Sequence, residues 1–149
     1  MSGISFASFT GTMSDPQRLD GTRILLVEDE ENVRRTLTTL LSMEGADVTS
    51  TGSGRHALEL AANGRFDLLL TDLDLPDVPG DAIIRQVLAE PNPGRVIVLT
   101  GSGQADLSRA RQAGAEIVLL KPVEWSTLVA QVRAAVRPGD VVRTTSQVA

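Results

Sequence analysis

The sequence contains no cysteine, and it contains one histidine among its 149 residues. Disulfide bonds and thiolate chemistry are therefore excluded, although the missing cysteine does not by itself fix the compartment. A zinc site is disfavoured, because zinc in proteins is held mainly by cysteine and histidine. Any metal chemistry in this chain has to rely on oxygen ligands.

Long apolar runs are also missing. No segment approaches the roughly 20 apolar residues that a membrane-spanning helix needs. The first 23 residues lack the basic region and apolar core of a signal peptide. We therefore expect a cytoplasmic protein with no membrane partner. The net charge of −5 argues against a general affinity for the phosphates of nucleic acids, so no nucleic-acid partner is expected either.

The composition that remains is typical of a globular domain, with 42% apolar and 22% charged residues. A chain of this length suits one domain with a core. Residues 1–21 are rich in serine, threonine and glycine and are predicted to be a flexible leader. Residues 22–137 are predicted to form the domain, and residues 138–149 a short C-terminal tail.

Strand-like and helix-like segments alternate along the domain. Strands are expected at 23–27, 46–50, 66–71, 95–100 and 116–120, and the helices after them at 31–45, 53–64, 79–90, 104–114 and 124–137. In the first helix Val33, Leu37, Leu40 and Leu41 have the spacing of a core-facing stripe. Most strands are apolar throughout, as happens when helices cover both faces of a sheet. The alternation predicts an α/β fold with a parallel sheet and right-handed crossovers.

Polar residues stand where four of the five strands end. Glu28 and Asp29 follow the first strand, Asp72 the third, and Lys121 the fifth, while Thr100 closes the fourth. In an open parallel sheet, ligands bind beyond the carboxyl ends of the strands. Each residue alone is a weak signal, but matching positions in four repeats indicate one site.

The residue types in this set indicate phosphoryl chemistry. Converging carboxylates repel one another unless a cation is present, and oxygen ligands suit Mg²⁺. A carboxylate beside Mg²⁺ and a lysine can attack phosphorus and form an acyl phosphate. The metal, the amine of Lys121 and the hydroxyl of Thr100 would then stabilise the phosphoryl oxygens. Asp72 is the candidate phosphoacceptor.

The chain resembles a response regulator receiver domain of two-component signalling over residues 23–136. The resemblance rests on four motifs: ILLVEDE, LLLTDLDLPDVPG, VIVLTG and AGAEIVLLKPV. It implies a flavodoxin-like sandwich of five helices around a five-stranded parallel sheet, in the order 2-1-3-4-5. It also implies that Asp29, Asp72 and the backbone carbonyl of Asp74 bind Mg²⁺ directly, that Glu28 helps through water, and that the Lys121–Pro122 bond is cis.

The same resemblance implies a signalling role. Asp72 would accept a phosphoryl group from a sensor histidine kinase or a histidine phosphotransfer protein, and Thr100 and Lys121 would contact that group. No enzymatic activity is expected beyond self-phosphorylation and autodephosphorylation. Because few residues follow the last helix, we expect a single-domain regulator or phosphorelay receiver without DNA-binding output. The face formed by 104–114, 116–120 and 124–137 is the expected partner surface and possible homodimer interface.

Four positions depart from the family pattern or add to it. Glu28 stands where the family more often has aspartate. Val118 replaces the usual tyrosine or phenylalanine that moves inward together with the threonine, and Val123 replaces a frequent aromatic after the proline. Asp74 adds a fourth acid, which together with Ser102 is hypothesised to set the lifetime of the phosphoryl group.

Two rival functions stay open on the sequence. The stretch LLLTDLDLP also resembles the first motif of haloacid-dehalogenase-type phosphatases, but those enzymes usually place it on their first strand. The second rival is a receiver-shaped interaction module that is never phosphorylated, for which Val118 is the argument. Structural roles are simpler alternatives at individual positions. Glu28 and Asp29 could cap the first helix, and Asp74, Asp77 and Asp81 could be solvated or turn residues.

Overall fold

The structure is a computed structural model that describes residues 18–101 and 103–136. Most of the predicted leader and all of the predicted tail lie outside these residues. The end of the leader is described, however, and it packs on the domain. Leu19 is 1% exposed, and its backbone N–H donates to the carbonyl oxygen of Glu44 at 2.9 Å. The folded unit therefore includes residues that precede the first strand.

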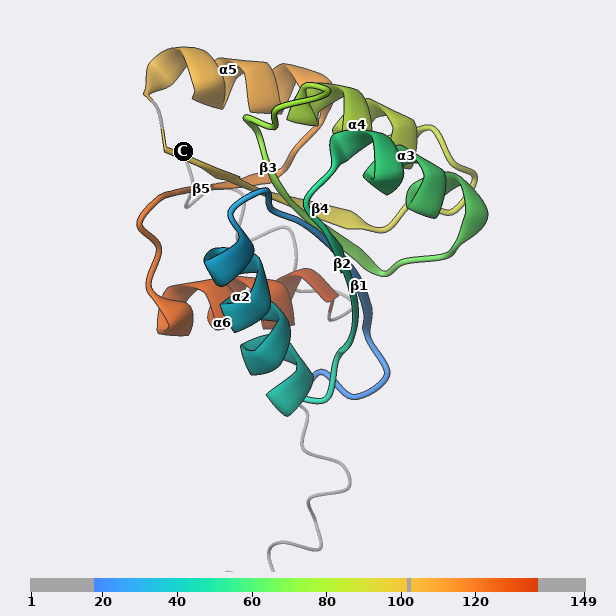
Figure 1. The fold of residues 1–149 in the computed structure, drawn as a ribbon, viewed down its shortest axis with the longest axis vertical. Helices are drawn as coiled ribbons and strands as arrows, with labels where there is room; N and C mark the ends of the chain where they lie inside the picture. The colour runs from blue at the N-terminus through green and yellow to red at the C-terminus, as the bar shows by residue number, and fades with distance from the viewer. Residues whose placement is uncertain (1–17, 102, 137–149) are drawn as a thin grey trace, which may run out of the picture.

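Five parallel strands form one sheet, in the order β2-β1-β3-β4-β5. The predicted fold class and strand order are thus confirmed (Figure 1). The strands are β1 (Arg23–Val27), β2 (Asp47–Thr51), β3 (Leu68–Asp72), β4 (Arg95–Thr100) and β5 (Ile117–Leu120). The third strand extends one residue further than predicted, so Asp72 is its last residue.

Each strand is followed by a helix, as the alternation predicted. The helices are α2 (Glu31–Met43), α3 (Gly54–Asn63), α4 (Gly80–Leu88), α5 (Gln104–Ala113) and α6 (Trp125–Val136). Their ends have local causes. The side chains of Glu30 and Ser53 accept hydrogen bonds from backbone N–H groups in the first turns of α2 and α3. Gly114 ends α5 in the left-handed conformation, with φ of 112°.

The core consists of two layers, one on each face of the sheet. Successive strand residues point to opposite faces. Leu25, Leu69 and Val98 therefore pack under α3, α4 and α5, whereas Leu26, Leu70 and Leu99 pack under α2 and α6. Figure 1 shows these two groups of helices on opposite sides of the sheet. Both faces of the central strands are covered, which accounts for their uniformly apolar sequences.

Two apolar residues that the sequence pattern would place inside are exposed. Val33 has the spacing of the core stripe of α2, but it is 39% exposed, because it lies in the first turn, close to the end of the sheet. Leu120 is 52% exposed at the end of the edge strand β5.

Within the described residues, no helix is both long enough and apolar enough to cross a membrane.

Candidate functional site

Three acids meet at the carboxyl ends of β1 and β3. Glu28, Asp29 and Asp72 each place one carboxylate oxygen within 4.8 Å of the others. Glu28 is 1% exposed and Asp72 is 6% exposed, whereas Asp29 is open to solvent. The predicted convergence of these residues is therefore present in the structure. We call this set the acid group.

Lys121 joins the acid group from the end of the edge strand β5. Its Nζ lies 3.1 Å from Oε1 of Glu28 and 2.9 Å from Oδ1 of Asp72. The backbone N–H of Lys121 donates to the carbonyl oxygen of Thr100 at 2.8 Å, which fixes the β5 end against the β4 end. The Lys121–Pro122 bond is cis, as the resemblance implied. The chain thus directs the ammonium group back between two carboxylates.

Burial dominates the electrostatics of Asp72. Desolvation, helped by the negative charge of Glu28, raises the pKa of its carboxyl to about 7, although the hydrogen bond from Lys121 opposes the shift. For Lys121, burial favours the neutral amine. The hydrogen bonds to Asp72 and Glu28 outweigh that effect and raise the pKa of the ammonium group. Lys121 therefore stays charged, and Asp72 is the residue of the site whose ionisation is disfavoured by burial.

The donor set fits a hard divalent cation. The acid group offers only oxygen ligands, which is the preference of Mg²⁺ and Ca²⁺. Three carboxylates and one ammonium group leave a net charge of −2 when all are ionised, and a divalent cation would balance it. The resemblance adds the backbone carbonyl of Asp74 to this set. The Asp74 side chain is 63% exposed and lies 3.5 Å from Arg109 Nη1.

The loop between β1 and α2 is held by contacts that the sequence analysis did not find. Oε2 of Glu28 accepts a hydrogen bond from the backbone N–H of Glu30 at 3.2 Å. The carbonyl oxygen of Glu28 accepts one from Nη1 of Arg34 at 2.9 Å. Arg34 stands in the first turns of α2, where a charged residue normally reads as solvated surface. Its position indicates instead that it fixes the loop that carries Glu28 and Asp29.

Thr100 lies at the end of β4 and is 1% exposed. Its hydroxyl donates to Oδ2 of Asp106, in the first turn of α5, at 3.2 Å. The threonine therefore stands at the predicted edge of the sheet, and a carboxylate outside the acid group accepts from its hydroxyl. Ser102, which was hypothesised to act with Asp74, lies outside the described residues.

Asp77 has a structural role that local sequence did not reveal. Its carboxylate accepts hydrogen bonds from the Ser53 hydroxyl and from the backbone N–H groups of Gly54, Arg55 and Val78, at 2.9 to 3.0 Å. The bonds from Arg55 and Gly54 hold the pKa of the carboxyl far below its usual range. Asp77 therefore ties the loop after β3 to the N-terminus of α3. Three of the four partners lie 22–24 residues away in sequence, so local sequence suggested only a turn residue.

Gly80 allows α4 to begin against the end of β3. A Cβ at this position would lie 2.4 Å from the carbonyl oxygen of Asp72 and 2.8 Å from the backbone of Leu73. A Cβ atom cannot approach backbone atoms this closely, so a larger residue would displace the strand end. The glycine therefore helps to fix the position of Asp72.

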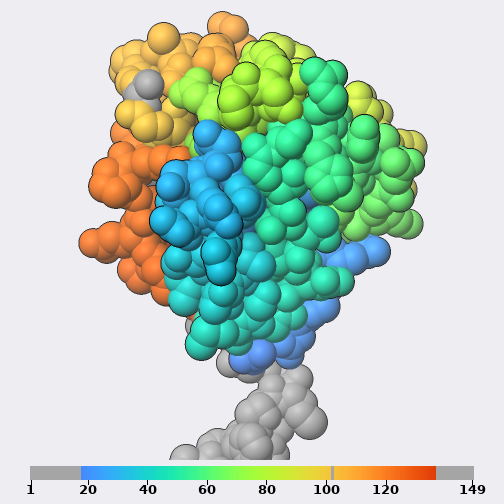
Figure 2. All heavy atoms as spheres, in the orientation of Figure 1, coloured from blue at the N-terminus to red at the C-terminus, as the bar shows by residue number. Residues whose placement is uncertain are grey.

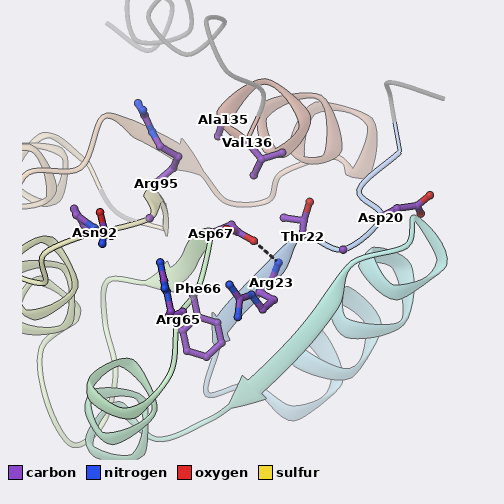
Figure 3. Close-up of a pocket in the computed structure, with 13 residues that line it drawn as sticks. Asp20, Thr22, Arg23, Arg65, Phe66, Asp67, Asn92, Arg95, Ala135 and Val136 are labelled. Atoms are coloured by element: carbon purple, nitrogen blue, oxygen red, sulfur yellow. Dashed lines mark hydrogen bonds between the residues drawn. The ribbon is translucent and has the colours of Figure 1, made fainter. Parts of the chain in front are cut away.

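A cavity of about 520 Å³ lies at the opposite edge of the sheet. Arg23 and Arg95, which begin β1 and β4, line it together with Asp67 and Val136. Figure 3 shows Asp67 directed toward Arg23, whose backbone N–H donates to its carboxylate at 2.8 Å. The acid group is at the other end of the strands. In Figure 2 the start of α2, in blue, adjoins segments in yellow-green and orange from later in the chain.

Known relatives place this arrangement in a signalling context. The chain is 37% identical over 120 residues to the transcriptional regulatory protein CutR of Streptomyces coelicolor, covering 80% of this chain and 55% of that protein. It is 34% identical over 118 residues to the DNA-binding response regulator MtrA of Mycolicibacterium paratuberculosis, covering 79% and 52%. The chain spans about half the length of the curated relatives it matches.

These relatives correct two expectations. A regulator without DNA-binding output was predicted from the few residues after the last helix, and a nucleic-acid partner was excluded from the net charge. Both predictions are wrong, because the relatives are transcriptional regulators and one is named as DNA-binding. The charge of −5 describes a chain matching only half of each relative. This charge therefore says nothing about nucleic-acid contacts made by the parts of the relatives that this chain does not match.

A solved structure and the family comparison agree with the relatives. The receiver domain of sensor histidine kinase PA1611 from Pseudomonas aeruginosa is 30% identical, with a TM-score of 0.72. The match covers 78% of this chain and 98% of that one. That structure is described as having a magnesium ion coordinated in its active site cleft. The family description "response regulator receiver domain" matches residues 24–133. The chain therefore belongs to the family of response regulator receiver domains.

Proposed function

We propose that this receiver domain accepts a phosphoryl group on Asp72 from a phosphohistidine of a sensor histidine kinase or phosphotransfer protein. The observation that carries the proposal is the position of Lys121, whose Nζ bridges Asp72 and Glu28 inside the acid group. A buried carboxylate with a lysine and two further acids suits a nucleophile toward phosphorus. No turnover of other substrates is proposed.

The transfer involves one bond formed and one broken. A carboxylate oxygen of Asp72 attacks phosphorus, and the phosphorus–nitrogen bond to the donor imidazole breaks. The electron pair of that bond stays on the imidazole nitrogen. The ammonium group of Lys121 stays hydrogen-bonded to Asp72 during the transfer, and its positive charge offsets the negative charge on the phosphoryl oxygens. Thr100, at the end of β4, supplies a hydroxyl that can donate to one of these oxygens.

We propose Mg²⁺ as the cation of the acid group. Asp29, Asp72 and the backbone carbonyl of Asp74 would hold it directly, and Glu28 would do so through water. A bound Mg²⁺ would stabilise negative charge on the phosphoryl oxygens and lower the repulsion among the carboxylates. The oxygen-only donor set supports this assignment, as does the magnesium ion in the related receiver structure.

The relatives support a further proposal about output. CutR and MtrA are regulators of transcription by name, so we propose that the phosphorylation state of this receiver controls a transcriptional response through DNA. The effect would pass through the surfaces that surround the site, since phosphorylation acts by shifting the equilibrium between two conformations. The homodimer through α5, β5 and α6 stays a prediction.

Intact-protein mass spectrometry tests the phosphoacceptor role. The protein is incubated with Mg²⁺ and phosphoramidate, beside Asp72→Ala and a sample with excess chelator. We expect one phosphoryl adduct on the wild type and none in either control. Asp47→Ala is a matched control, because Asp47 is an exposed aspartate at the start of β2, and this variant should carry the adduct.

Two results would contradict the proposal. Folded wild-type protein that binds Mg²⁺ without gaining an adduct would indicate an interaction module that is not phosphorylated. Sustained turnover of a small phosphate ester such as p-nitrophenyl phosphate would instead indicate a phosphatase. A receiver accepts one phosphoryl group per molecule and releases it slowly, so the two activities are distinguished by the number of turnovers.

A further inference from the structure

Arg109 on α5 binds three carboxylates from three segments. Its Nη2 lies 3.0 Å from Oδ1 of Asp81 on α4, and its Nη1 lies 3.3 Å from Oδ1 of Asp106 on α5. The same Nη1 lies 3.5 Å from Oδ1 of Asp74, in the loop after β3. We call these four residues the Arg109 cluster. It connects α5, α4 and the loop that carries a proposed Mg²⁺ ligand.

The Arg109 cluster is partly buried. The Asp106 and Asp81 side chains are 13% and 18% exposed, whereas the Arg109 side chain is 39% exposed. The hydrogen bond from Arg109 keeps the pKa of Asp81 below its usual value, although burial of Asp81 acts in the opposite direction. Pairs with this much exposure add little stability. The position of the cluster therefore matters more than its contribution to stability.

The cluster reaches the phosphorylation site through Thr100. The Thr100 hydroxyl donates to Oδ2 of Asp106 at 3.2 Å, and Arg109 binds the other oxygen of the same carboxylate. A hydroxyl has one hydrogen to donate. The phosphoryl oxygens on Asp72 are acceptors as well, so they compete with Asp106 for that hydrogen. Only one of the two acceptors can have it at a time.

We propose that Asp106 is a positioning residue for Thr100, held in place by Arg109, and that phosphorylation of Asp72 draws the Thr100 hydroxyl away from Asp106. The proposal rests on the proposed function of Asp72. Without the hydrogen bond from Thr100, the Asp106 carboxylate would keep Arg109 as its partner among the described residues. The contacts of α5 with α4 and with the loop after β3 would then rearrange.

This route suits a chain that has valine at position 118. Val118 is 3% exposed within the core and offers neither a ring nor a hydroxyl to follow a moving threonine. The Arg109 cluster offers a polar connection from the same threonine to the same helix. Asp81, Asp106 and Arg109 thus supply the coupling for which the family pattern has an aromatic residue at position 118.

The test is the rate of phosphorylation by phosphoramidate in Mg²⁺, followed by intact mass. Asp106→Ala removes the competing acceptor, so Thr100 no longer has to give up its bond to Asp106 when it turns to the phosphoryl group. We expect a rate increase of about tenfold, the usual effect of one hydrogen bond to a charged group. Asp106→Asn keeps an acceptor oxygen without the charge and should give a smaller increase. Arg109→Ala should also give a smaller increase.

Arg35→Ala is the matched control for Arg109→Ala. It removes the same charge from an exposed ion pair with Glu31 on α2, away from the Arg109 cluster. Its rate should equal that of the wild type. Circular dichroism of each variant checks that α5 is retained.

A double-mutant cycle with Thr100→Val separates positioning from a structural effect. If Asp106 acts through Thr100, Asp106→Ala changes nothing in the Thr100→Val background. An equal gain in both backgrounds, or no gain in the wild-type background, would overturn the inference. A wild-type protein that never forms the adduct would instead refute the proposed function, so the two failures are distinguishable.

Discussion

At the scale of single residues, Asp72 carries an electrostatic cost. Its carboxylate is 6% exposed beside Glu28, and burial raises its pKa to about 7 against an ordinary value of 3.8. Below about pH 4 the carboxyl is protonated in folded and unfolded chains alike. Between pH 4 and 7 the folded chain keeps a proton that the unfolded chain has released, so the free energy of unfolding falls as the pH rises.

Removing this charge should therefore stabilise the metal-free protein at neutral and higher pH. We expect Asp72→Asn to increase the free energy of unfolding at pH 8 by about 1–3 kcal/mol, and to leave it nearly unchanged near pH 4. Urea denaturation in the presence of chelator measures the difference at each pH. Asp47→Asn, at an exposed position, should show no such dependence. If Asp72→Asn were no more stable than the wild type at pH 8, the ionised Asp72 carboxylate would carry no electrostatic cost, and the prediction would be wrong.

The residues that converge at the site could be predicted where each directly follows a strand. Glu28, Asp29, Asp72 and Lys121 were found this way, because parallel strands of adjacent repeats end at one edge. Arg34 and Arg109 were missed. Each is a charged residue on a helix, and only tertiary structure shows that its side chain turns toward a loop or a carboxylate.

At the scale of elements, the periodicity of apolar residues was sufficient for the order and type of strands and helices. The same periodicity did not predict burial correctly where a turn of a helix lies near the end of the sheet. Val33 has core spacing yet is exposed, because its turn of α2 lies near the end of the sheet. The packing of Leu19 was also missed, since a short segment rich in polar residues has no period to read.

The tie between the loop after β3 and α3 gives a prediction at this scale. Asp77→Ala leaves the backbone N–H groups of Gly54 and Arg55 without their acceptor. The start of α3 then loses two hydrogen bonds, although Ser53 still caps it, and the loop loses its anchor. We expect the thermal midpoint to fall by at least about 3 °C. Asp77→Asn keeps one acceptor oxygen of the two and should fall between the variant and the wild type.

The same tie should also slow phosphorylation when it is removed, because the loop after β3 carries the carbonyl of Asp74. Differential scanning calorimetry and the phosphoramidate assay measure the two effects. Asp47→Ala is the control for loss of an aspartate at an exposed site. An unchanged midpoint in Asp77→Ala would show that solvent replaces the four hydrogen bonds at no cost.

At the scale of the whole molecule, the sheet brings residues from both halves of the chain into one charged group. Glu28 and Lys121 are 93 residues apart in sequence and lie 3.1 Å apart in space. Stability and function are therefore linked at this edge: the fold has to oppose the repulsion of the acid group. Any ligand that relieves this repulsion in the folded state stabilises the whole domain.

Mg²⁺ should be such a ligand. At concentrations ten- to a hundredfold above its dissociation constant we expect it to add about 1–3 kcal/mol to the free energy of unfolding, and to raise the thermal midpoint by a few degrees. Asp29→Asn replaces a charged carboxylate ligand with a neutral amide at an exposed position and leaves the core unchanged, so the gain should shrink strongly. Asp47→Asn should keep the full gain. Near pH 5.5 the gain should also shrink, because protons then occupy Asp72. Calorimetric scans with Mg²⁺ and with chelator measure each case, and an equal gain in Asp29→Asn and the wild type would place the ion outside the acid group.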